Sequence, residues 1–212
     1  MPLLIFLVLF TVACSPTQKA YYQNFTLFLE SNEAYSLSQQ EVIDSNADLI
    51  LVSINGKPAG TMALAYIELG QYKWVGQNSE VFVLEQGRII RQINKEQGIE
   101  GPSISPTTQA LASESSALVD WYPSAFAYNY SVKPSKTEHT NIRVFSDSTP
   151  VYCKSEAVTV SMNATNLFDG INQFCFSKQS NSLLMTEQLS VTGDTVGIVF
   201  VSRVLRERGL ID

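Results

Sequence analysis

Apolar residues divide the chain into a short apolar start and a long region of mixed, alternating character. From Leu3 to Ala13 the sequence reads LLIFLVLFTVA, without one charged side chain. A helix that crosses a membrane needs about 20 apolar residues, and this run is shorter and ends in small residues. The pattern therefore predicts a signal peptide over residues 1–13 rather than a membrane-spanning helix.

The end of the apolar run indicates how the signal peptide is processed. Thr11-Val12-Ala13-Cys14 resembles the bacterial lipobox, in which a small residue precedes a cysteine whose thiol takes a diacylglycerol. Leu is commoner where Thr11 stands, and no Lys or Arg precedes the apolar run. We expect Cys14 to be lipidated and to open a polar tether over residues 14–20. An ordinary cleaved signal and a misassigned start codon are the alternatives.

The residue after Cys14 indicates which membrane would hold the lipid. Ser15 stands there, and Asp, the usual residue for retention in the inner membrane, is absent from that position. In a Gram-negative cell this favours the periplasmic face of the outer membrane. We therefore expect a lipid-anchored protein in which residues 21–212 form a single β-rich periplasmic domain.

Two short helices are expected at the start of that domain. Apolar residues over 21–30 follow a spacing that would lay one helical face on a core. Ser38 is followed three residues later by Glu41, which is the capping-box spacing at a helix start. This second helix would run through Val42 and Ile43.

From Ala47 onward the pattern changes to short runs rich in Val, Ile and aromatic residues, separated by turn residues. Asn55-Gly56 lies between two such runs and signals a hairpin, because both turn positions need a positive φ. Gly87 divides another pair, and residues 97–117, rich in Gly, Pro and Ser, are expected to form a long loop. The expected strands are Asp48–Ile54, Met62–Leu69, Tyr72–Val75, Glu80–Leu84, Arg88–Ile93, Val119–Tyr130, Asn141–Phe145, Val151–Val160, Phe174–Ser177, Leu183–Leu189 and Thr195–Leu205.

Short strands at hairpin spacing with few helices predict a mainly β fold. We expect an antiparallel meander forming a barrel-like or strongly curved sheet, with one or two short N-terminal helices. Turns are expected between the later strands at Lys133-Pro134-Ser135, Thr149-Pro150, Asp169-Gly170, Ser180-Asn181 and Gly193-Asp194.

Three cysteines would leave an exported protein with one thiol that has no disulfide partner, and lipidation of one cysteine removes this problem. With Cys14 used by lipid, Cys153 and Cys175 remain as a pair that an oxidising periplasm would join in a disulfide. Two separate buried thiols are the alternative. No metal site is expected, because two cysteines and the single His139 show no ligand spacing.

Charge and motifs argue against several functional classes. The net charge is −6 without a cluster of Lys and Arg, which argues against nucleic acid as a partner. The sequence contains no Gly-x-Ser-x-Gly elbow, dinucleotide-binding motif or phosphate-binding loop, so no cofactor is expected. His139 lies in a polar stretch and is expected on an exposed loop. No catalytic residue is expected, because Glu85, Asp120, Glu156 and Glu187 are scattered and have the pattern of surface charges.

Several segments follow one another in an order that is typical of one family. Leu37–Ile43, then the Asn55-Gly56 turn, matches an N-terminal helix and first hairpin, and Val81–Arg91 matches a strand pair with a Gly-Arg turn. Asn172–Phe176, followed by Glu187-Gln188, matches a later hairpin that ends near a Gln. Together these segments resemble the YjbF/GfcB lipoproteins, which are associated with group 4 capsule and exopolysaccharide secretion. The family's recurrent positions are matched here by Trp74, Gly87, Arg88, Trp121 and Gln188.

The later hairpin departs from the family's pattern. Cys175 stands where the family usually has Trp, Ser177 where it often has Asp, and Ser180-Asn181 replaces a Thr-Gly turn. The resemblance implies a β-barrel-like fold and no established catalytic residue. It implies structural roles for the matching positions: a glycine for a turn, tryptophans for the core, and a buried contact of the arginine with a carboxylate or carbonyl.

The first functional hypothesis is a non-catalytic outer-membrane lipoprotein that is accessory to exopolysaccharide or group 4 capsule secretion or assembly. Its partners would be the membrane, through the lipid on Cys14, and polysaccharide-export proteins or glycan. The alternatives are a periplasmic carrier that holds an apolar ligand on the concave face of the sheet, and an enzyme that modifies polysaccharide. The carrier needs a sizeable apolar cavity, and the enzyme needs two carboxylates, or a His with partners, in one cleft.

Overall fold

The computed structural model describes residues 37–77, 80–94, 99–101, 114–121, 125–190 and 192–212. All described residues belong to one compact unit, Glu33–Asp212. The expected signal peptide, Cys14, the tether and the helix expected over 21–30 therefore lie outside the described residues.

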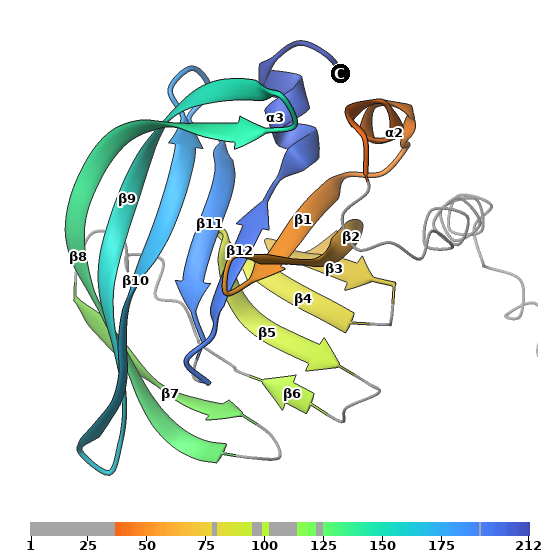
Figure 1. Ribbon diagram of the computed structural model, residues 1–212. Coiled ribbons are helices and arrows are strands. Elements are labelled where there is room, and N and C mark those ends of the chain that lie inside the picture. The colour runs from red at the N-terminus through yellow and green to blue at the C-terminus, as the bar shows by residue number, and fades with distance from the viewer. Residues whose placement is uncertain (1–36, 78–79, 95–98, 102–113, 122–124, 191) are drawn as a thin grey trace, which may run out of the picture. The chain divides into compact units, whose positions relative to one another are not determined.

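The described strands form one antiparallel sheet of twelve (Figure 1). Their order is β6-β5-β4-β3-β2-β1-β12-β11-β10-β9-β8-β7, so two meanders of six strands meet where β1 pairs with β12. The strands are β1 Leu49–Ile54, β2 Lys57–Glu68, β3 Gln71–Gly76, β4 Glu80–Glu85, β5 Arg88–Asn94, β6 Ile99–Gly101, β7 Ser115–Trp121, β8 Ala125–Val144, β9 Asp147–Met162, β10 Thr165–Ser177, β11 Leu183–Leu189 and β12 Thr195–Val199.

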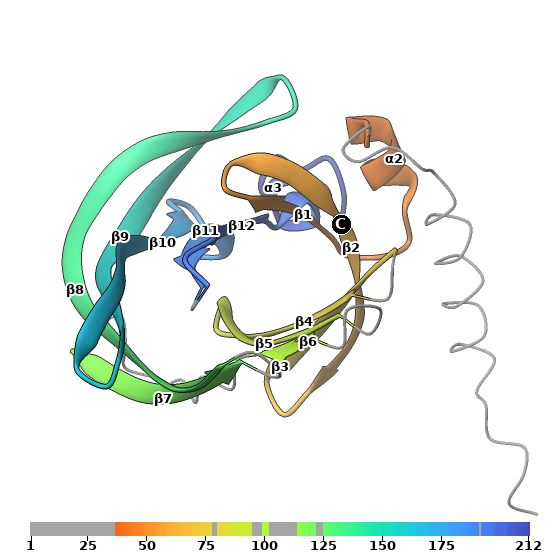
Figure 2. The ribbon, with the colours of Figure 1, turned by 60° about the horizontal axis from the view of Figure 1, so that its bottom comes forward.

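The sheet is strongly curved, so that its two edge strands, β6 and β7, approach each other (Figure 2). Within the described residues no ladder pairs these two strands, and the hydrogen-bonded sheet stays open between them. The expectation of a mainly β fold built from an antiparallel, strongly curved sheet is confirmed.

The helix α2, Gln39–Asp44, begins where the capping-box spacing predicts. The Glu41 backbone N–H donates to Ser38 Oγ at 3.3 Å, and the Ser38 backbone N–H donates to Glu41 Oε2 at 2.6 Å. These reciprocal bonds satisfy two donors that a helix start leaves without intrahelical partners. No helix in the described part of the chain is long and apolar enough to cross a membrane.

The strand expected over Thr195–Leu205 is wrong in its second half. β12 ends at Val199, and residues Val201–Glu207 form the helix α3. Val201, Val204 and Leu205 are buried at the i, i+3, i+4 spacing of one helical face, and this period overrides the strand preference of valine. The Ser202 hydroxyl accepts the backbone N–H of Leu49 at 2.8 Å, which ties α3 to the start of β1.

Three expected turns, at Lys133-Pro134-Ser135, Thr149-Pro150 and Asp169-Gly170, lie inside strands β8, β9 and β10. Pro134 pairs with Glu156 of β9 but lies beyond Val132, the last β8 residue that pairs with β7. Proline lacks an N–H, and a strand edge tolerates it because that donor has no partner strand there. The register of the β8–β9 ladder also shifts between Pro134 and Thr137, so the strand continues past the proline with an irregularity.

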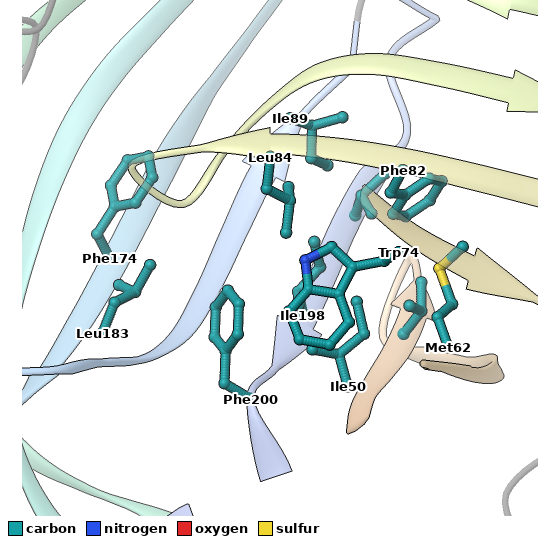
Figure 3. Close-up of a cluster of buried hydrophobic side chains, with 12 residues drawn as sticks. Ile50, Met62, Trp74, Phe82, Leu84, Ile89, Phe174, Leu183, Ile198 and Phe200 are labelled. Carbon is teal, nitrogen blue, oxygen red and sulfur yellow. The ribbon is translucent and has the colours of Figure 1, made fainter. Parts of the chain in front are cut away.

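The main hydrophobic cluster lies between the first meander and the central strands (Figure 3). Trp74 of β3 is 2% exposed and meets the ring of Phe200 edge to face, with ring centroids 5.9 Å apart. Ile50 and Ile198, from the paired strands β1 and β12, pack beside them. Burying these large side chains contributes about 2 kcal/mol each, so the cluster links the two meanders.

A disulfide joins Cys153 of β9 to Cys175 of β10. The two residues face each other directly in the β9–β10 ladder, with their Cα atoms 4.0 Å apart, and both are buried. The covalent bond therefore fixes the register of the long hairpin that β9 and β10 form.

Candidate functional site

The turn between β4 and β5 is held against β11 by the side chain of Gln188. The Ile89 backbone N–H donates to Gln188 Oε1 at 3.1 Å, and Gln188 Nε2 donates to the Gly87 carbonyl at 2.9 Å. The amide thus bonds to the turn as a neighbouring strand would. Gln86 and Gly87 have φ values of 50° and 83°, and a Cβ on Gly87 would overlap Leu183 Cδ2. Glycine is required here both for the turn and for its close approach to β11.

Arg88, the first residue of β5, forms a buried ion pair with Glu156 of β9. The side chain of Glu156 is fully buried, and its Oε1 accepts the bond from Arg88 Nη2. The Arg88 guanidinium also lies over the ring of Phe174, 4.8 Å from the ring centroid. Glu156 Oε2 has no hydrogen-bond partner among the described residues. Charge buried at this depth requires its partner, because either charge alone would lose its hydration without compensation.

Tyr130 of β8 and Asn172 of β10 form further polar contacts with each other and with the backbone of Leu189 in β11. The Tyr130 hydroxyl donates to the Leu189 carbonyl at 2.9 Å, and the Leu189 backbone N–H donates to Asn172 Oδ1 at 2.9 Å. Asn172 Nδ2 donates to the Tyr130 hydroxyl at 3.1 Å. Burial raises the pKa of Tyr130 to about 12, although the hydrogen bond from Asn172 lowers it in part.

These five buried side chains make three sets of polar contacts, which we call together the interior polar network: Arg88, Tyr130, Glu156, Asn172 and Gln188. It connects the β4–β5 turn to the strands of the second meander. Its donors and acceptors are mostly used on one another and on the backbone, which is the arrangement of a structural clamp.

Glu187 and His139 lie outside this network. Glu187 precedes Gln188 in β11, so its side chain points to the opposite face of the sheet. His139 is exposed on β8, in a strand rather than the expected loop, and its ring centroid lies 6.4 Å from that of Tyr152. No group of three or more His, Cys, Asp or Glu residues in the described ranges could hold a metal ion.

Comparison with known proteins places this chain in a family. A family model described as group 4 capsule polysaccharide lipoprotein GfcB, YjbF matches residues 22–195. The chain belongs to the YjbF family. The expected resemblance is therefore confirmed.

The individual relatives share little sequence identity with this chain. The uncharacterized lipoprotein YjbF of Escherichia coli (strain K12) is 28% identical over 92 residues, which is 43% of this chain and 43% of that protein. The crystal structure of the hypothetical lipoprotein YmcC from Escherichia coli (K12) has a TM-score of 0.69 and 15% identity. It covers 85% of this chain and 93% of its own, so the two share the curved β fold. None of these descriptions names a catalytic activity.

The structure brings together three of the five positions that match the YjbF family. Gly87, Arg88 and Gln188 meet at the β4–β5 turn, and Trp74 lies apart from them in the hydrophobic cluster. Trp121 ends β7, and its side chain lies outside the described residues, as does Cys14.

The family resemblance implied a carboxylate or carbonyl partner for Arg88, but sequence reasoning did not identify which residues are the partners at this site. Glu156 was expected on the surface, and the structure corrects this because Arg88 neutralises it in the interior. Asn172 and Tyr130 were not identified as polar partners either. One signal was present: Glu156 stands in a strand whose next alternate positions, Val158 and Val160, are apolar and buried on the same face.

Proposed function

We propose that this YjbF family member is a non-catalytic lipoprotein that is accessory to the secretion or assembly of a capsular or exopolysaccharide. The observation that carries the proposal is the family match over residues 22–195, under a description that joins lipoprotein and group 4 capsule polysaccharide. The interior polar network supports the non-catalytic part, because its charges pair with each other and its amides bind backbone groups.

The proposal includes a lipid on Cys14 and a position at the periplasmic face of the outer membrane. The apolar run before Cys14 and the small residues at its end support lipidation, and Ser15 supports the outer membrane. Residues 14–20 would act as the tether, and residues 21–212 as one periplasmic domain. The partners would be the membrane, through this lipid, and export proteins or the glycan itself.

The apolar side chains of the interior favour this role over that of a carrier for an apolar ligand. Trp74, Phe200 and Ile198 pack against one another between the meanders (Figure 3). An enzyme on polysaccharide would need separated carboxylates around a sugar, whereas Glu156 is fully buried against Arg88.

A deletion strain tests the role in polysaccharide secretion. We expect less polysaccharide on the cell surface, with an unchanged composition of the repeat unit, because an accessory protein assists export and does no chemistry on sugars. Normal surface polysaccharide in that strain would refute the proposed role. A changed repeat unit would instead favour the enzyme.

Growth with labelled palmitate tests the anchor separately. Wild-type protein should take up the label and fractionate with outer membranes, and the Cys14→Ala variant should stay unlabelled. Equal labelling of the two proteins would refute lipidation at Cys14.

A further inference from the structure

Aromatic and cationic side chains contact one another in one region of the fold. We call this region the aromatic–cation strip, and its members are Tyr72, Tyr152, Lys154, Phe176 and Arg203. Tyr152 of β9 and Phe176 of β10 are paired residues whose rings stack, with centroids 5.4 Å apart. Lys154 Nζ lies 5.7 Å from the centre of the Phe176 ring. These three side chains are partly exposed and share one face of the sheet.

Leu183 connects this part of the strip to Arg203 and Tyr72. Leu183 pairs with Phe176 across the β10–β11 ladder, and its carbonyl accepts a hydrogen bond from Arg203 Nη1 at 3.3 Å. The Arg203 guanidinium lies 5.5 Å from the ring centre of Tyr72 and 4.4 Å from that of Phe200. Tyr72 and Arg203 are also partly exposed, and they form the second part of the strip, beyond the buried side chain of Leu183.

The two cations of the strip form no ion pair within the described residues, although the charge of Asp48 acts on Arg203. Neither Lys154 nor Arg203 has a carboxylate oxygen within 4.0 Å in that part of the chain. Nearby acids are engaged elsewhere: Asp48 accepts a 2.6 Å bond from Arg206, and Glu207 binds the hydroxyl of Ser177 at 2.6 Å. On a chain with net charge −6, the strip is therefore a local site where positive charge faces aromatic surface.

We propose that the aromatic–cation strip binds an acidic polysaccharide. Aromatic rings offer flat apolar surface with a polar edge, which suits the apolar face of a sugar ring, and Lys and Arg suit its carboxylates. The inference rests on the proposed function, which already concerns a polysaccharide, and it adds the charge of the ligand and the residues that contact it. Lys154 and Arg203 hold the acidic groups, and the partly exposed ring of Tyr152 holds a sugar ring. Tyr72 and Phe176 pack against the hydrophobic cluster and position the two cations, which lie over their rings.

Binding of defined polysaccharides to the purified full-length protein in detergent tests this inference. The probes are polygalacturonate, which is acidic, and dextran, which is neutral. We expect the wild type to bind polygalacturonate and not dextran, with affinity that falls as salt is raised. Lys154→Gln should weaken binding about fivefold and reduce its salt dependence, and Tyr152→Leu should weaken it by a similar factor.

Lys133→Gln is the matched control, because it removes the same charge from a side chain that is 71% exposed on β8, outside the strip. It should bind polygalacturonate as the wild type does, and thermal unfolding should show that all variants are folded. The inference is overturned if the wild type does not bind polygalacturonate, if dextran binds equally well, or if the two lysine variants lose equal affinity.

The deletion strain separates this inference from the proposed function. If the deletion lowers surface polysaccharide but the purified wild type does not bind polygalacturonate, the strip proposal fails and the accessory role stands. If the deletion changes nothing while the strip binds polygalacturonate, the accessory role fails and the binding site stands.

Discussion

At the scale of single residues, the pair of Arg88 and Glu156 has the largest expected energetic consequence. Glu156 is fully buried and Arg88 is 9% exposed, so each depends on the other for electrostatic compensation. A buried pair of this kind is weak evidence of net stabilisation, because two apolar side chains can replace it at little cost. Removing only one member of the pair is different, because the other charge then stays buried without a partner.

Substituting one member of this pair should therefore destabilise the fold more than substituting both. We expect Glu156→Leu to lower the free energy of unfolding by about 3–5 kcal/mol, because Arg88 is left buried without its partner. The double variant Arg88→Met/Glu156→Leu should recover most of that loss. Urea unfolding of the wild type, both single variants and the double variant measures the coupling, and additive losses would contradict this account.

Tyr130 gives the fold a pH dependence in the alkaline range. Burial raises the pKa of Tyr130 to about 12, above the ordinary value of 10.0, so the fold favours the neutral phenol. A raised folded-state pKa adds stability that is complete below the unfolded pKa and is lost as pH rises through the folded one. The Tyr130 contribution should therefore disappear between pH 10.0 and about 12.

The Tyr130→Phe variant isolates this contribution from other titrating groups. At neutral pH it should be less stable than the wild type by about 1 kcal/mol, because the bonds of the hydroxyl to Leu189 and Asn172 are lost. The difference should shrink as pH rises above 10.0, since ionisation of Tyr130 then destabilises the wild type alone. Urea unfolding across this range provides the check, and a constant difference would argue against the assignment.

At the scale of elements, the β4–β5 turn depends on how closely it approaches β11. Gly87 and Gly70 both lie in hairpin turns with positive φ, at 83° and 81°. A Cβ on Gly87 would overlap Leu183 Cδ2, whereas a Cβ on Gly70 would meet nothing within 4 Å. A comparison of the two positions therefore separates the cost of the left-handed backbone, which both share, from the cost of crowding Leu183, which only Gly87 has.

Alanine at these two glycines should have unequal effects on stability. Gly70→Ala should cost about 1 kcal/mol for the left-handed backbone alone. Gly87→Ala should cost about 1–3 kcal/mol more, because Leu183 must also move within the core. Thermal unfolding of the two variants measures this difference, and equal losses would show that the turn is not pressed against β11.

The elements that the sequence predicts well are those with local causes. The Ser38–Glu41 capping box begins α2, and Asn55-Gly56 forms a hairpin turn with positive φ at both residues. Pro134 is a turn residue by local preference, but the free edge of β8 accepts it inside a strand. The strand expected over Thr195–Leu205 failed in its second half because Val201, Val204 and Leu205 suit either a strand or a helix.

At the candidate site, too, the sequence does not predict contacts between residues that are far apart along the chain. Family resemblance identified Gly87, Arg88 and Gln188, yet their meeting point depends on the path of the chain between β5 and β11. Glu156 lies 68 positions after Arg88, and no local pattern relates the two residues. Partners of this kind follow from the topology of the sheet.

At the scale of the whole molecule, the pairing of β1 with β12 makes one sheet of the two meanders. Leu51 faces Val199 and Ile54 faces Val196 in this ladder, and Trp74 and Phe200 pack across the junction. The polar network adds a second connection, from the β4–β5 turn to β9 and β11. The first meander is thereby fixed to the strands β9, β11 and β12 of the second.

The central claim is that this domain assists polysaccharide secretion while it is anchored through Cys14. The most direct measurement is the amount of surface polysaccharide in a deletion strain that carries either the wild-type gene or the Cys14→Ala gene. Immunoblots of the periplasm should show that the unanchored protein accumulates. We predict that the wild type restores surface polysaccharide and that Cys14→Ala does not. Equal restoration by both genes, or no loss of polysaccharide on deletion, would contradict the account.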